Sequence, residues 1–161
     1  MDELTKQLLV AADDSKSFES PYPLDSSEYS KYYTEIVALG PELDRTVGQK
    51  LEFSPMEDAS ICALYGLWIP GPPPDNYTKA PILREAIILV TFSNFGRFFS
   101  VSFTAREHLP FLVLGEVIKF GESRGFIHLS DAVLDERYTG PYRFPDDRTI
   151  PTWRDRFFGY S

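Results

Sequence analysis

Residues 85–104 read EAIILVTFSNFGRFFSVSFT. The first eight residues are rich in β-branched and apolar side chains, which favour a buried strand. The next four, Ser93-Asn94-Phe95-Gly96, have the composition of a turn. In the second half, Phe99, Val101 and Phe103 alternate with two serines, which is the period of a strand. The segment therefore predicts an antiparallel β-hairpin.

Further strands and helices are expected on both sides of this hairpin. The apolar run at residues 61–69 predicts a buried strand, although a short helix is an alternative. Shorter strands are expected near residues 47–55 and 126–129. Helical spacing of apolar residues covers residues 2–13, about 26–39 and 108–121, with a short helix after Ser130 and a last helical turn from Trp153 to Tyr160.

Several residues define these helices more closely. The first helix has its apolar side chains at Leu4, Leu8, Ala11 and Ala12. Gly40 and Pro41 are expected to end the second helix. Gly121 is expected to end the helix at 108–121, and Ser130 to cap the short helix that follows it.

These elements predict one α/β (α+β) domain spanning residues 1–161. We expect an antiparallel sheet centred on the hairpin at 85–104, covered by helices from the N-terminal segment and from residues 108–121. The composition supports this architecture, since 43% of the 161 residues are hydrophobic and 15% are aromatic. A chain of this length and composition can bury one core.

The charge of the chain is concentrated in its first part. The formal net charge is −8, and residues 1–60 carry all of it, with thirteen acidic and five basic residues. Such acidity argues against nucleic acid and against an anionic membrane as direct ligands, because phosphate groups would be repelled. It suits a basic protein partner, and it is equally compatible with simple solubility.

The sequence offers little catalytic chemistry, so we predict no enzyme activity, cofactor or metal site. Glu107 and His108 could act as acid or base, but they precede a helix as an ordinary surface loop would. His128 and Asp131 lack a recognisable nucleophile nearby. The single cysteine, Cys62, lies in an apolar run and is expected to be buried. Without an evident signal peptide or membrane span, a cytoplasmic location is expected.

The remaining signals are those of protein contact. Acidic side chains occur in predicted loops beside aromatic or proline residues, a combination that protein interfaces use for anchoring and for electrostatic steering. The alternative is a solvated acidic surface. The predicted partner-binding residues are Glu57, Asp58, Asp75, Tyr77, Asp146 and Asp147.

The tail of the chain, Tyr138-Thr139-Gly140-Pro141 and then Trp153-Arg154-Asp155-Arg156-Phe157-Phe158-Gly159-Tyr160, resembles the C-termini of small immunity proteins of bacterial toxin–immunity pairs. The size, acidity and mixed α/β texture are similar to those proteins as well. The resemblance implies a protein that binds a cognate cytosolic toxin and blocks it without catalysis. A nuclease toxin fits best, because its nucleic-acid cleft is basic.

Two other functions stay open from the sequence. A secretion chaperone or adaptor would bind an effector segment as a dimer, and the helix containing Leu112 to Phe120 could form its interface. A small enzyme would use Glu107, His108 or His128 in a shared pocket. For the immunity protein, reversing the charge of Asp146 and Asp147 is expected to weaken binding and reduce its salt dependence.

Overall fold

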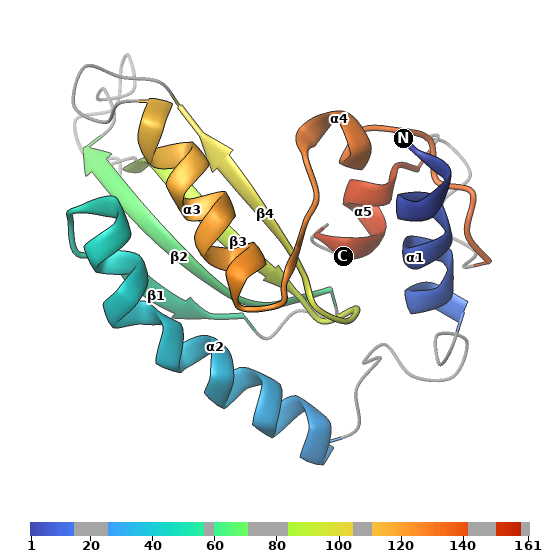
Figure 1. Ribbon diagram of the computed structural model, residues 1–161, viewed down its shortest axis with the longest axis horizontal. Coiled ribbons are helices and arrows are strands. Elements are labelled where there is room, and N and C mark those ends of the chain that lie inside the picture. Colours follow the sequence, from blue (N-terminus) through green and yellow to red (C-terminus); the bar gives the residue numbers. More distant parts are fainter. Residues whose placement is uncertain (15–25, 57–59, 71–83, 105–110, 142–150, 159–161) are drawn as a thin grey trace, which may run out of the picture.

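The computed structural model describes residues 1–14, 26–56, 60–70, 84–104, 111–141 and 151–158 (Figure 1). Its helices are α1 (Glu3–Asp14), α2 (Ser26–Val47), α3 (Phe111–Ser123), α4 (Asp131–Leu134) and α5 (Trp153–Phe157). Its strands are β1 (Glu52–Pro55), β2 (Ile61–Pro70), β3 (Arg84–Ser93), β4 (Phe98–Phe103) and β5 (Ile127–His128). The predicted α/β fold class is therefore confirmed.

The central hairpin forms as predicted. β3 and β4 pair antiparallel, with Val90 opposite Val101 and Phe92 opposite Phe99. Gly96 in the connecting turn has a φ of 80°, a left-handed conformation that glycine adopts without steric cost. The apolar run at 61–69 is the strand β2 rather than a helix, and it pairs antiparallel with β3.

The sheet has five strands in the order β1-β2-β3-β4-β5. The first four are antiparallel neighbours, as expected. β5 differs, because it joins β4 in parallel through only two residue pairs. Helix α3 makes this connection possible, since a chain that returns to run parallel needs a crossover between the two strands. The sheet is thus mixed rather than wholly antiparallel.

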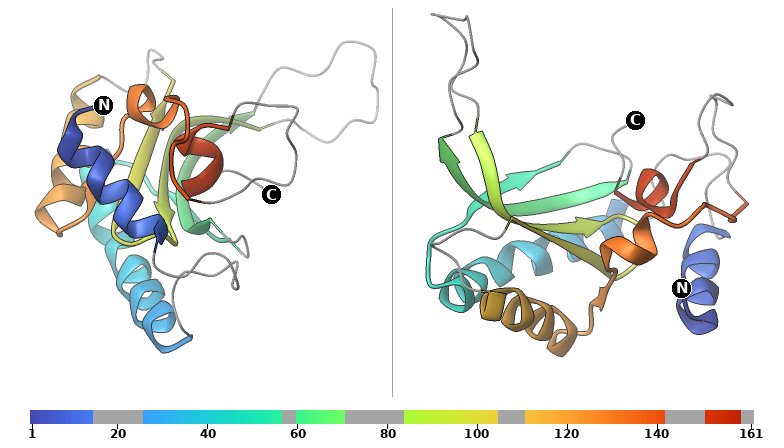
Figure 2. Two further views of the ribbon diagram at one scale, coloured as in Figure 1. Left: turned by 90° about the vertical axis from the view of Figure 1, so that its right-hand side faces the viewer. Right: turned by 90° about the horizontal axis from the view of Figure 1, so that it is seen from above.

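Helices α2 and α3 cover one face of the sheet (Figure 2, right). Their apolar side chains pack on the inward residues of β2, β3 and β4 to form the sheet core, which is built around Ile36, Leu43, Ile88, Phe99 and Val117. Each of these side chains is at most 1% exposed. The apolar residues that alternate along the strands therefore pack against the apolar residues spaced 3–4 apart on the two helices, and together they form one apolar layer.

Helix α2 runs through Gly40 and Pro41 instead of ending there, so that prediction was wrong. Proline has no N–H, and in a helix it leaves the carbonyl four residues earlier without its usual donor. Here that carbonyl belongs to Val37. The hydroxyl of Tyr65 on β2 supplies the missing donor, with its oxygen 3.1 Å from the carbonyl oxygen of Val37 and 2.9 Å from that of Ile36.

Gly40 makes room for the same ring. A Cβ on Gly40 would lie 3.1 Å from the Tyr65 hydroxyl oxygen and 3.2 Å from a ring carbon. Burial raises the pKa of Tyr65 to about 12, so the hydroxyl keeps its proton and stays a donor. Gly40 and Pro41, which predict a helix end in the sequence, therefore serve the contact with Tyr65: Gly40 leaves space for its ring, and Pro41 leaves a carbonyl free for its hydroxyl.

We expect Tyr65→Phe to lower the free energy of unfolding by about 1–2 kcal/mol, because the Val37 carbonyl loses its donor. In a Pro41→Ala background the backbone N–H returns, so the same substitution should cost at least about 0.5 kcal/mol less. Denaturant unfolding of the wild type, both single variants and the double variant measures this coupling. An equal cost of Tyr65→Phe in both backgrounds would contradict the compensation.

Helix α3 also passes its predicted end. It continues to Ser123, and Gly121 lies inside it, buried against the ring of Phe99. The turn that follows uses Gly125, which has a φ of 79°. A Cβ on Gly121 would overlap the Phe99 ring, so this glycine sets the close approach of α3 to β4. Gly115, in the same helix, has no atom within 4 Å of such a Cβ.

These two glycines give a matched pair of substitutions. Gly121→Ala is expected to destabilise the protein by about 1–3 kcal/mol, because the added methyl overpacks the core at Phe99. Gly115→Ala is expected to stabilise it by about 0.4–1 kcal/mol, since the methyl meets open space and restricts the unfolded chain. Thermal unfolding monitored by circular dichroism distinguishes the two signs, and equal effects would refute the packing role of Gly121.

A second apolar cluster lies beyond the hairpin turn, where α1, α4 and α5 gather (Figure 1). We call it the C-terminal cluster; its buried members are Leu9, Phe95, Phe98, Leu129, Leu134, Tyr138, Trp153, Phe157 and Phe158. The predicted docking of Trp153 and Phe157 is confirmed, while Tyr160 lies outside the described residues. Ser130 precedes α4, but its side chain makes no capping hydrogen bond.

Helix α1 docks on this cluster through a different face from the one the sequence suggests. Leu4 and Leu8 are 67% and 39% exposed, whereas Leu9 and Asp13 are fully buried. Leu9 packs inside the C-terminal cluster, and Val10 and Ala12 lie partly buried against it. Arg156 also holds the Asp13 carboxylate, with its Nε 2.6 Å from Oδ1, so the buried face of α1 is the one that carries Leu9 and Asp13.

Arg97 fixes the hairpin turn to the helical layer. Its guanidinium donates two hydrogen bonds to Glu35 on α2, at 2.8 and 2.6 Å, and lies over the ring of Phe126 at 4.3 Å. It also donates to the carbonyls of Arg124 and Gly125. The hydrogen bonds from Arg97 lower the pKa of Glu35, so the carboxylate stays charged at neutral pH.

Candidate functional site

The residues predicted to bind a partner all lie in segments that the structure does not describe. This holds for Glu57, Asp58, Asp75, Tyr77, Asp146 and Asp147. Glu107 and His108 also fall outside the described residues. Their grouping into an interface or a pocket therefore stays a prediction.

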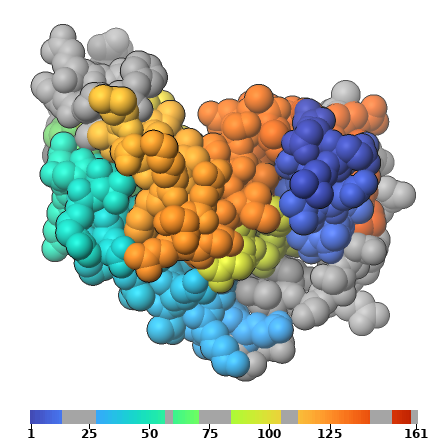
Figure 3. Space-filling model, viewed as in Figure 1, coloured from blue at the N-terminus to red at the C-terminus, as the bar shows by residue number. Residues whose placement is uncertain are grey.

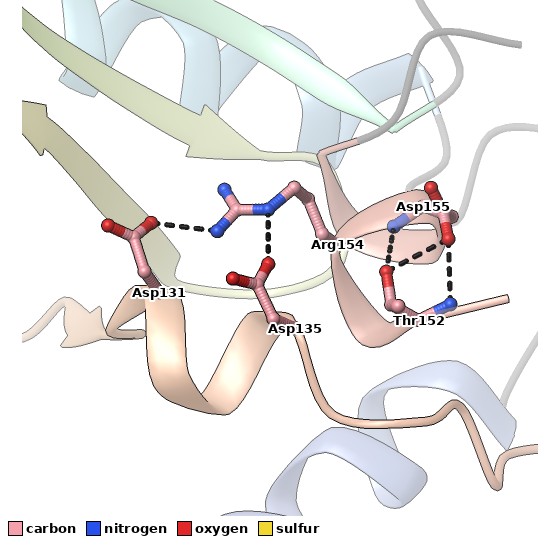
Figure 4. A network of polar contacts seen from close by, with 5 residues as sticks. All are labelled: Asp131, Asp135, Thr152, Arg154 and Asp155. Carbon is pink, nitrogen blue, oxygen red and sulfur yellow. Dashed lines mark hydrogen bonds and ion pairs between the residues drawn. The ribbon is translucent and has the colours of Figure 1, made fainter.

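His128 is described, and its surroundings are those of a packed strand residue. Its ring lies 5.3 Å from that of Phe99, and burial lowers its pKa. The Asp131 carboxylate does not bond to it, but accepts a hydrogen bond of 2.7 Å from Arg154 (Figure 4). His128 and Asp131 therefore do not form the linked pair that acid–base relay chemistry uses.

Arg154 instead holds the C-terminal elements together. Its guanidinium bridges Asp131 and Asp135 of α4 and the residue after it, as Figure 4 shows. Thr152 and Asp155 form a reciprocal capping box at the start of α5. These contacts satisfy helix ends and cross-link two short helices, so we assign them to structure rather than to ligand binding.

Cys62 is fully buried near the start of β2, as the sequence predicts. Burial raises the pKa of its thiol to about 11, against the smaller opposing effect of a hydrogen bond from Tyr29. The thiol is therefore protonated at neutral pH and a poor nucleophile. Its contribution is apolar packing beneath α2.

Metal ligands do not cluster in the described ranges, where no three His, Cys, Asp or Glu side chains gather closely enough to hold an ion. Among the same residues, no helix is both long enough and apolar enough to cross a membrane.

The more informative surface is the sheet face turned away from α2 and α3. Phe53 and Tyr65 contact the helical layer, so their strand neighbours Glu52 and Gly66 point to the other side. Trp68 follows two residues after Gly66 and shares this face. Within the described part of the chain, no helix lies over this end of β1, β2 and β3 (Figure 2, right).

Gly66 leaves room for the indole of Trp68 against the sheet. A Cβ on Gly66 would lie 2.6 Å from the indole Nε1 and 2.8 Å from Cε2, so the ring occupies the space that any other side chain would need. Trp68 remains partly exposed in this position. The spacing Gly66-x-Trp68 is visible in the sequence, but it identifies a platform only when residues 61–69 are known to be a strand.

Arg84 and Glu52 frame the ring. The Arg84 Cζ lies 5.5 Å from the centre of the Trp68 ring, within cation–π range. Its two terminal nitrogens donate to the two carboxylate oxygens of Glu52 at 3.1 and 2.5 Å. This bond lowers the pKa of Glu52, and both side chains are about half exposed. We call Glu52, Gly66, Trp68 and Arg84 the Trp68 platform.

Exposure on this face increases toward the platform. Thr91 of β3 and Ser100 of β4, near the hairpin turn, are 7% and 5% exposed. One step further along the strands, Leu89 is partly exposed and Ser102 is exposed. The end of this face near the hairpin turn is buried inside the protein. The exposed end carries an aromatic ring and an arginine, the types of side chain that dominate binding energy at protein interfaces.

No family model matches the chain, and neither a curated protein nor a solved structure is significantly similar to it. The functional argument therefore depends on the residues themselves.

We predict that Gly66→Ala increases acrylamide quenching of tryptophan fluorescence, because the added Cβ would push the indole of Trp68 off the sheet. The second tryptophan, Trp153, is 1% exposed and contributes little to the quenchable signal. Ser102→Ala, on the same sheet face, is the control and should leave quenching unchanged. Unaltered quenching in Gly66→Ala would show that the glycine does not position the ring.

Proposed function

We propose that the protein is an immunity protein that binds a cognate toxin domain, most suitably a nuclease, and blocks it by occluding its active site or substrate surface. The observation that carries the proposal is the Trp68 platform, a partly exposed Trp–Arg pair on a sheet face. Preorganised aromatic and guanidinium groups lose little conformational entropy on binding, which suits a tight inhibitor.

The charge of the chain supports a basic partner. The net charge of −8 favours fast encounter with a cationic surface such as a nucleic-acid-binding cleft. In this proposal the platform supplies the anchor, and the acidic residues predicted from the sequence steer the approach. Asp146 and Asp147 are the residues we would test first among them. The inhibitor acts without a cofactor, in the bacterial cytoplasm where its toxin would act.

A secretion chaperone is the second candidate, and one observation favours it. Leu112, at the start of α3, is 80% exposed. An exposed leucine on a helix end is a suitable contact for a dimer of the kind that holds an effector segment. The two proposals use different surfaces, the Trp68 platform for the inhibitor and the start of α3 for the chaperone.

The test is co-expression with the product of the adjacent upstream gene, scored by growth and by co-purification. If the immunity proposal holds, the neighbour alone arrests growth and this protein relieves the arrest in a one-to-one complex. Trp68→Ala should raise the Kd of that complex by about 30-fold or more, as loss of a hot-spot residue does. Charge reversal of Asp146 and Asp147 should weaken it mainly at low salt.

Leu112→Ala is the matched control, because it removes an exposed apolar side chain that lies outside the Trp68 platform. It should leave the inhibitor complex intact. A harmless neighbour that co-purifies with a dimer of this chain, with the dimer lost in Leu112→Ala, would replace the immunity proposal by the chaperone. Full protection by Trp68→Ala with unchanged affinity would remove the platform from the interface.

A further inference from the structure

The register of the sheet shows which side chains surround the indole of Trp68. Glu52 of β1 lies opposite Gly66 of β2, Gly66 lies opposite Leu89 of β3, and Leu89 lies opposite Ser102 of β4. Residues that lie opposite each other in a sheet share a face, so this row crosses the sheet on the side away from α2 and α3. The indole of Trp68 lies over Gly66, at the place in the row between Glu52 and Leu89.

The neighbours of the indole on β3 and β4 are uncharged and reach the surface. Ala86 lies directly opposite Trp68, and both Ala86 and Leu89 are partly exposed. Ser102, at the β4 end of the row, is exposed. Because Ala86 and Ser102 are short, a group that docks beside the indole can reach the surface of the sheet. A flat ring in this position contacts the indole, the methyl group of Ala86 and the side chain of Leu89 together.

The charges on this face of the sheet cancel. Among the described residues of β1 to β4 that share the face, Glu52 and Arg84 alone carry a formal charge. Glu85 lies opposite Ile69, which packs against the sheet core, and so it points to the other side. The two terminal nitrogens of Arg84 each donate to one carboxylate oxygen of Glu52, at 3.1 and 2.5 Å. The face is therefore neutral, although the chain as a whole carries −8.

A charged group of a partner gains little on a face of this kind. A cation would meet the guanidinium of Arg84, whose Cζ already lies 5.5 Å from the centre of the Trp68 ring. An anion would meet the carboxylate of Glu52 and the net negative charge of the chain. In either case the arriving charge loses water and finds no free opposite charge. An uncharged aromatic ring avoids this cost and adds an offset or edge-to-face contact with the indole.

We propose that the Trp68 platform, with Ala86 and Leu89 beside it, is the docking site for an uncharged aromatic side chain of the partner. The inference rests on the proposed function for the identity of the partner, and it specifies which of the partner's groups enters the platform. The contact between toxin and inhibitor then has two parts. An aromatic ring anchors the complex on this sheet face, and the acidic residues predicted from the sequence meet basic side chains of the toxin.

The test uses the full-length chain and N-acetyl-phenylalaninamide as the probe, with nuclear magnetic resonance of the indole N–H groups. The chain has two tryptophans, and Trp68→Phe assigns their signals. The Trp68 signal should shift saturably with the aromatic probe, and little with the corresponding derivatives of arginine and glutamate at the same concentration. The signal of Trp153, which is 1% exposed, is the internal reference and should not move.

Two leucines provide matched variants for this measurement. Leu89→Ala should weaken binding of the aromatic probe at least about threefold, because the ring loses part of its apolar contact. Leu112→Ala should leave binding unchanged, since α3 belongs to the helical layer on the other side of the sheet, which faces the viewer in Figure 3. Glu52→Gln leaves the charge of Arg84 without its partner, so the glutamate derivative should then shift the Trp68 signal.

The probe measurement needs no toxin, so its outcome is separate from that of the co-expression test. The inference is overturned if the aromatic probe leaves the wild-type Trp68 signal in place, or if the arginine or glutamate derivative shifts it as strongly. It is also overturned if Leu89→Ala and Leu112→Ala bind the aromatic probe equally well. Selective binding of the aromatic probe, together with a co-expression test that finds no toxin, would support the site and reject the immunity function.

Salt dependence gives a second measurement once a toxin complex is in hand. The affinity lost in Trp68→Ala should be the same at low and at high salt, because salt does not screen a contact between uncharged groups. A loss that disappears at high salt would place a charged group of the toxin on the platform and overturn the inference, while the immunity function would stand.

Discussion

The hydroxyl of Tyr65 joins the second strand of the sheet to the middle of α2, at the carbonyl that Pro41 leaves without a donor. With this carbonyl satisfied, α2 continues for about two more turns to Val47 and brings Leu43 and Val47 into the core. The end of α2 in turn sets where β1 begins, and the Asp44 side chain accepts a hydrogen bond from the amide of Leu51 in the connection. This side-chain donor thus fastens the middle of α2 to the second strand, at the centre of the layer that α2 and α3 form on the sheet.

The sequence predicted those parts of the fold in which local pattern and tertiary packing agree. The hairpin of β3 and β4 is such a case, because β-forming residues flank a glycine turn that needs no distant partner. The ends of α2 and α3 are the opposite case. Pro41 and Gly121 are helix-ending residues by local rules, yet Tyr65 and Phe99 from the sheet make each of them tolerable within a helix. Such compensation involves residues distant in sequence, so no local pattern reveals it.

The candidate site was less predictable than the fold. Charge pointed to loops around Asp75 and Asp146, which the structure does not describe, whereas the described surface offers Trp68 between Arg84 and Glu52. Arg84 and Glu52 lie 32 residues apart in sequence and meet only because β1 and β3 flank β2. Sequence spacing could identify Gly66 and Trp68 as neighbours on one face, but the exposure of that face depends on where α2 and α3 dock.

The C-terminal cluster has a consequence for the order in which the protein folds during synthesis. Residues 26–128 contain the whole sheet and both of its covering helices, so this part can collapse while the rest of the chain is still being made. Leu9 and Asp13 are translated early. The cluster that Leu9 shares with Trp153 and the ion pair of Asp13 with Arg156 can form only after those two residues have been synthesised. Until residue 157 has emerged from the ribosome, Phe95 and Phe98 lack the ring of Phe157 that packs on both, so the nascent chain exposes apolar surface there.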